Sequence, residues 1–140
     1  MFNFKFSRCK STLQKTFSNC FDPLKDELGT VPVKLHDSKY VTASMIGICE
    51  AYANHLGLKK TQQQALLIDA AFEEVFRRES TTILTQTDQW KDDNNEEFMR
   101  AYQNGLNHMQ SLLNHDNQLN IDWLKDYLVA HYEPSRNLML

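Results

Sequence analysis

Glycine and proline are scarce in this chain of 140 residues, which contains four glycines and three prolines. Because all-β folds need many tight turns, this scarcity argues against a sheet-rich protein and favours helices joined by short loops. Hydrophobic residues make up 41% of the chain and charged residues 24%, a composition typical of globular rather than disordered proteins. We therefore expect residues 1–140 to form one all-α domain, a bundle of about five or six helices.

Long apolar runs and closely spaced cysteines are also missing. The most apolar stretch, residues 65–72, contains Asp69 and ends after eight residues, whereas a membrane-spanning helix needs about 20. The start of the chain lacks a continuous apolar segment, so we expect no secretory signal. Cys9, Cys20 and Cys49 are too far apart for a zinc pattern or a redox pair. Together these absences predict a cytoplasmic protein with reduced thiols.

The sequence contains none of the common signatures of metal, nucleotide or catalytic sites. It has no Glu-x-x-His pair of a di-iron bundle, no His-Glu-x-x-His motif and no EF-hand loop. It also has no Gly-rich phosphate loop and no Gly-x-Ser-x-Gly nucleophile motif. We therefore expect no metal and no cofactor, and we predict a protein that is not an enzyme.

Positive charge is concentrated at the N-terminus. Residues 1–21 contain four basic residues and no acidic residue, a charge of +4, whereas the rest of the chain has 11 basic and 18 acidic residues, a charge of −7. The acidic body and a sequence pI near 5.9 argue against nucleic acid as a partner.

Apolar residues in the same segment recur every three or four positions, which predicts an amphipathic helix over about residues 2–21. We expect this helix to pack on the acidic body. Phe4 falls on the opposite side of the helix from Phe2 and Phe6, so it is a candidate interaction residue. The alternatives for residues 1–21 are a foot on a membrane surface, a mitochondrial-type presequence, and an arm that binds a partner or nucleic acid.

A helix predicted from about residue 39 to residue 56 has a face of small residues. Ala43, Gly47 and Ala51 are four positions apart, and small side chains at this spacing allow a second helix backbone to approach closely. A tight crossing inside the protein is the simpler explanation. The alternative is a self-association surface, which makes these three residues candidates for a homo-oligomer contact.

The next helix is the most apolar part of the chain, so we place it at the centre of the bundle, over about residues 62–79. Thr61 and Gln64 are spaced as a capping box at its start. Residues 80–92 are weakly patterned, further helices are predicted after Asp93 and Asn120, and a loose tail is expected over about residues 134–140.

Five side chains are candidates for a ligand pocket, because each is polar or aromatic on a predicted apolar face. They are Glu79, Tyr52, Tyr102, Tyr127 and His131. Glu79 continues the line of Phe72 and Val75, so it is either a costly buried carboxylate or marks a frayed helix end in solvent. For the aromatic residues and His131, ordinary core packing is the simpler explanation.

Two hypotheses about function follow from these patterns. The leading one is a non-enzymatic module that binds a protein partner or a second copy of itself. The alternative is a protein that binds a small cationic or amphipathic molecule in an aromatic-lined pocket between helices.

Overall fold

The computed structural model describes residues 2–107 and 119–135, except for the side chains of Phe2 and Asn3. The prediction of an all-α bundle is confirmed. The α-helices of the described residues are α1 (Phe2–Phe21), α2 (Lys39–His55), α3 (Thr61–Phe76), α4 (Ser80–Asp92), α5 (Glu96–Asn107) and α7 (Asp122–His131). Short 3-10 helices join them: η1 (Asp22–Leu24), η2 (Val33–Asp37) and η3 (Arg77–Glu79).

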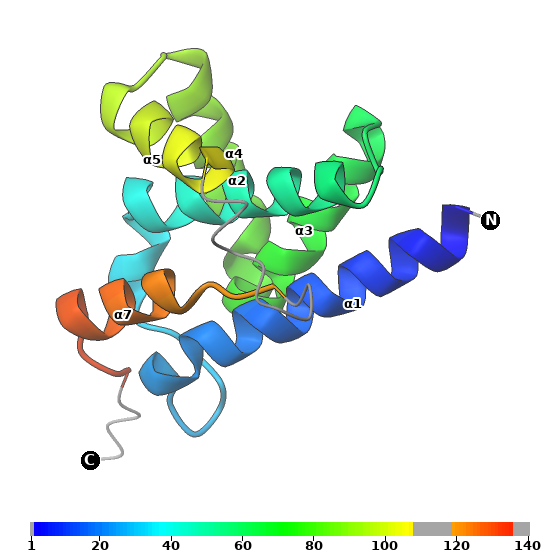
Figure 1. Ribbon diagram of the computed structural model, residues 1–140. Coiled ribbons are helices and arrows are strands. Elements are labelled where there is room, and N and C mark those ends of the chain that lie inside the picture. The colour runs from blue at the N-terminus through cyan, green and yellow to red at the C-terminus, as the bar shows by residue number, and fades with distance from the viewer. Residues whose placement is uncertain (1, 108–118, 136–140) are drawn as a thin grey trace.

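Helix α3 lies at the centre of the arrangement, as its apolar composition predicts. It packs against α1, α2 and α4, while α5 packs on α2 and α7 packs on α1 (Figure 1). Phe72 and Leu67 of α3 are completely buried. Full burial of such a side chain contributes about 1.5–3 kcal/mol to folding, so α3 anchors the elements on either side of it.

Helix α1 buries one face and exposes its positive charges. Cys9, Leu13 and Phe17, spaced four residues apart, are completely buried, and Phe6 packs at the edge of the same core. The basic residues of α1 are all exposed. The helix therefore packs through its apolar stripe on the rest of the chain, as expected. The described residues contain no helix that is both long and apolar enough to cross a membrane.

The small-residue face of α2 is covered by α5 of the same chain. Gly47 and Gly105 lie where the two helices cross: a Cβ atom on Gly47 would lie 2.5 Å from the Tyr102 carbonyl oxygen and 3.1 Å from the Gly105 Cα. Ala43 is fully buried and Ala51 is 6% exposed. This face is therefore an internal helix crossing, and the alternative of a self-association surface at Ala43, Gly47 and Ala51 is wrong for the folded chain.

Helix α3 begins and ends differently from the prediction. Thr61 is its first residue, its N-cap is Lys60, and no side chain caps it. The Gln64 side chain instead donates hydrogen bonds to the Asn54 Oδ1 and the Leu58 carbonyl oxygen, both at 2.8 Å. The helix ends at Phe76 because Arg77 has a φ of 55° and a ψ of −123°, a conformation that L-residues rarely adopt. The predicted extension of this helix to residue 79 is therefore wrong.

Other boundaries also differ from the prediction. Residues 80–92, weakly patterned in sequence, form α4, which buries Ile83 and Thr87. Directly after α1 the chain forms the 3-10 turn η1, with Pro23 as its second residue. Residues 108–118, which follow the helix predicted after Asp93, and most of the predicted tail at 134–140 lie outside the described residues.

Replacing Gly47 by alanine tests the α2–α5 crossing. Helix propensity alone favours alanine over glycine by about 0.8–1.0 kcal/mol, whereas a Cβ atom 2.5 Å from a backbone oxygen forces the helices apart. We expect Gly47→Ala to lower the free energy of unfolding by about 1–3 kcal/mol, measured by urea denaturation. A variant as stable as the parent would show that the helices do not cross this closely.

Candidate functional site

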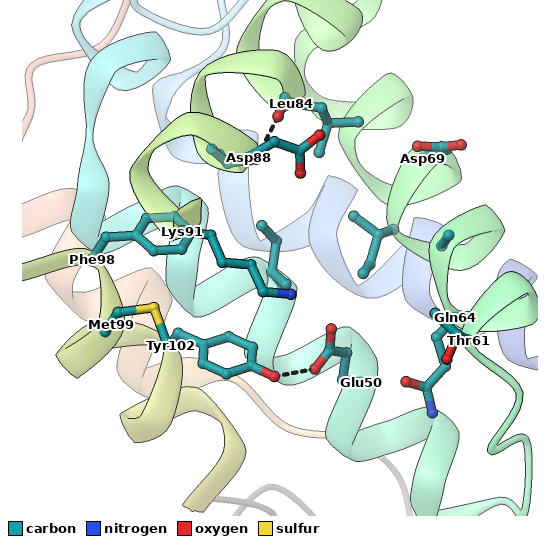
Figure 2. A pocket seen from close by; sticks show the side chains of 14 residues that line it. Glu50, Thr61, Gln64, Asp69, Leu84, Asp88, Lys91, Phe98, Met99 and Tyr102 are labelled. Atoms are coloured by element: carbon teal, nitrogen blue, oxygen red, sulfur yellow. Dashed lines mark hydrogen bonds between the residues drawn. The ribbon is translucent and has the colours of Figure 1, made fainter. Parts of the chain in front are cut away.

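A cavity of about 260 Å³ lies between α2, α3, α4 and α5 (Figure 2). Its apolar wall receives side chains from all of these helices. The residues of this wall include Ile46, Ile68, Leu84, Phe98 and Met99. Since Phe98 is buried and the others are half-buried, the cavity offers an apolar surface that reaches from the core towards solvent.

Charged groups surround this apolar wall. Glu50 of α2, Asp69 of α3 and Asp88 of α4 line the cavity together with Lys91 of α4, so three carboxylates and one ammonium give it a formal charge of −2. Figure 2 shows the Lys91 side chain extending into the space between the helices. Lys91 forms no ion pair with another described residue. The cavity therefore has a net negative field that no fixed ion pair of Lys91 neutralises.

Glu50 is the least exposed of these three carboxylates. It is half-buried, and its carboxylate accepts a hydrogen bond from the Tyr102 hydroxyl of α5 (Figure 2). Burial, together with this hydrogen bond and the nearby Glu50 charge, raises the pKa of Tyr102 above its ordinary value of 10.0. Tyr102 therefore stays protonated at neutral pH and remains a donor to Glu50.

The close crossing of α2 and α5 creates this pair. Glu50 lies three residues after Gly47, and Tyr102 lies three residues before Gly105. Since residues three apart lie on the same side of a helix, bringing the two glycines into contact also brings Glu50 and Tyr102 together. Glu50 was not among the residues predicted from sequence, and the signal that could have identified it is its position about one turn after Gly47 in the small-residue face.

Two polar side chains at the cavity are held in place by hydrogen bonds. The buried Thr87 hydroxyl donates to the Leu84 carbonyl oxygen at 2.7 Å. Gln64 is fixed by its bonds to Asn54 and Leu58. These hydrogen bonds fix the positions of Thr87 and Gln64 in the cavity wall.

Of the five predicted pocket residues, only Tyr102 lines this cavity. Glu79 is exposed in η3. Of the two alternatives predicted for it, the structure therefore shows the carboxylate in solvent and not the buried one. Tyr52 is buried in the core cluster that also contains Cys9 of α1, and burial raises its pKa. The structure therefore does not bring these residues together in one pocket.

Tyr127 and His131 form a separate aromatic stack on α7. The Tyr127 ring lies 4.1 Å from the ring of Tyr40 and 4.1 Å from that of His131. His131 is exposed, and its Nδ1 lies 2.9 Å from the Tyr127 carbonyl oxygen. The inward position predicted for His131 is wrong, because α7 turns Leu124 and Leu128 towards the core.

All three cysteines are buried and have free thiols. Burial raises the pKa of Cys9 to about 11 and that of Cys20 to about 12, and it raises the pKa of Cys49 well above 9.0. Since the thiolate is the nucleophile and the metal ligand, these thiols are poorly suited to either role at neutral pH. Among the described residues no three histidine, cysteine or acidic side chains are grouped as metal ligands.

Comparison with protein-family models, with curated proteins and with solved structures finds no match to this chain. The site must therefore be interpreted from its own geometry.

Replacing Tyr102 by phenylalanine tests the pair with Glu50. The folded protein holds the phenolic proton more tightly than the unfolded chain, whose tyrosines lose it near pH 10. The contribution of the protonated Tyr102 hydroxyl to the free energy of unfolding is therefore present below pH 10 and is lost as the pH rises above 10. We expect Tyr102→Phe to be about 1 kcal/mol less stable near pH 8 and to lose stability more slowly above pH 10, in urea titrations at several pH values.

Tyr132→Phe is the matched control, since it also removes one phenol. It should follow the alkaline stability profile of the parent. If Tyr102→Phe follows that profile as closely as the control does, Tyr102 is not held protonated by Glu50.

Proposed function

We propose that this protein binds a small amphipathic cation in the cavity between α2, α3, α4 and α5. The single observation that carries the proposal is the combination of an apolar wall with three carboxylates and one ammonium around the same space. Pockets for small molecules are mostly apolar and contain a few polar groups that orient the ligand. A ligand with a hydrocarbon or aromatic part and an amine matches both features.

The wall residues suggest how such a ligand would lie. Its apolar part would pack against Phe98, Met99 and Ile68, and its ammonium would face Glu50. Because Glu50 is half-buried while Asp69 and Asp88 are exposed, water screens the attraction of the two aspartates more strongly. Glu50 is therefore the principal cation-binding group in the proposal, and the aspartates contribute weaker long-range attraction.

The size of the cavity limits the ligand. Its volume of about 260 Å³ lies just below the roughly 300–1,000 Å³ of typical small-molecule pockets. The proposal is therefore restricted to compact amines with a single ring or a short aliphatic chain.

Two features of the sequence suggested a module that binds a protein partner: the small-residue face of α2 and the exposed Phe4. Only Phe4 remains available in the folded chain. The small-residue face of α2 is covered by α5, whereas Phe4 remains 68% exposed among basic residues. A cytoplasmic location is also part of the proposal, because three buried free thiols suit a reducing compartment.

Three probes of similar shape and different charge test the proposed function: 2-phenylethylamine, 2-phenylethanol and 3-phenylpropionate. We expect the amine to bind at least about tenfold more tightly than the alcohol, which corresponds to about 1.4 kcal/mol of charge recognition. The anionic acid should bind most weakly. Isothermal titration calorimetry measures all three affinities on the same preparation.

Matched variants locate the binding site. Glu50→Gln keeps an acceptor for the Tyr102 hydroxyl but removes the charge, so it should erase most of the preference for the amine. Glu79→Gln removes one carboxylate outside the cavity and should leave the affinities unchanged. Equal binding of the amine and the alcohol by the parent, or an unchanged preference in Glu50→Gln, would rule the proposal out.

A further inference from the structure

Basic residues from two distant segments meet at one end of the molecule. The Lys5 Nζ lies 3.8 Å from the position that a Cβ atom on Gly57 would occupy, so the first turns of α1 lie beside the turn between α2 and α3. That turn contains Lys59 and Lys60, which are exposed. We call the surface formed by Phe4, Lys5, Arg8, Lys59 and Lys60 the basic end.

No acidic residue comes from either segment that builds the basic end. Residues 1–21 contain no aspartate or glutamate, and neither do residues 51–68. Lys5, Arg8, Lys59 and Lys60 are exposed and form no ion pair with another described residue. Their charges are therefore not neutralised within the described part of the chain.

An exposed aromatic ring lies among these charges. Phe4 is 68% exposed, and the guanidinium of Arg8 lies 5.7 Å from the centre of its ring. Figure 1 shows that the N-terminal turns of α1 project beyond the other helices. The apolar ring and the cations are thus presented together on a projecting part of the molecule.

We propose that the basic end docks on the surface of an anionic lipid bilayer. The cations would lie among the lipid headgroups, where each lysine or arginine adds an attraction that falls off within a Debye length. Phe4 would enter the boundary between headgroups and acyl chains, as exposed aromatic residues do on interfacial helices. This site is distinct from the cavity, and its occupancy does not depend on the proposed amine ligand.

The charge distribution favours a bilayer over other anionic partners. The chain carries a net charge of −3 and the basic end carries +4, so the residues outside the basic end carry −7. An extended anionic surface therefore attracts the basic end and repels the rest of the molecule, which sets the orientation. A polyanion such as a nucleic acid satisfies the cations but provides no apolar layer beneath its charges for Phe4. A bilayer provides both.

Vesicle co-sedimentation with the full chain tests the proposal. We expect binding to phosphatidylcholine vesicles that contain about 30% phosphatidylserine, with little binding to pure phosphatidylcholine. Raising the salt concentration from about 0.05 M to about 0.3 M should weaken binding, because it shortens the Debye length.

Paired variants separate the basic end from net charge. Lys59→Gln with Lys60→Gln should weaken partitioning about 25-fold, at about fivefold for each cation. Lys34→Gln with Arg78→Gln makes the same change in net charge at exposed positions in η2 and η3 and should weaken it much less. Phe4→Ala should also lower binding, whereas Val33→Ala, at a residue that is 72% exposed, should not.

Three results would overturn the proposal. The first is equal binding to neutral and anionic vesicles, and the second is no binding to either. The third is an equal loss of vesicle binding in the Lys59→Gln/Lys60→Gln and Lys34→Gln/Arg78→Gln double variants. If the protein instead binds duplex DNA or polyglutamate but no vesicles, the basic end recognises a polyanion and the bilayer is excluded.

Discussion

The backbone contact between Gly47 of α2 and Gly105 of α5 is the constraint on which the candidate site depends. A Cβ atom on either residue would lie 2.9 Å or less from a backbone oxygen of the other helix, so the observed helix separation requires glycine at both positions. One turn away from the crossing, Glu50 and Tyr102 are brought within hydrogen-bonding distance. The crossing therefore builds one side of the cavity and covers the face that would otherwise be available for self-association.

Helix α3 connects the two functional surfaces that we propose. It packs against α1, which carries most of the basic end, and also supplies Ile68 and Asp69 to the cavity. Its fully buried Leu67 and Phe72 hold these two sides in a fixed relation. The cavity and the basic end are therefore parts of one packed body, although they consist of different residues and carry opposite charges.

Helical periodicity predicted the parts of the fold that depend on local sequence. The apolar stripe through Leu13 and Phe17 is buried in α1, and the all-α class follows from such stripes. Periodicity could not predict where α3 ends, because the break comes from the backbone of Arg77. It also could not pair Glu50 with Tyr102, since their contact spans 52 residues and results from the packing of α2 on α5. An inward position for Glu79 would require α3 to continue past Phe76, where the helix ends.

The opposite charges of the two surfaces make the two proposals compatible in one setting. An anionic bilayer attracts the cations of the basic end and also concentrates amphipathic cations at its own surface. A protein docked through Lys59 and Lys60 would therefore lie where the ligand class suited to Glu50 is enriched.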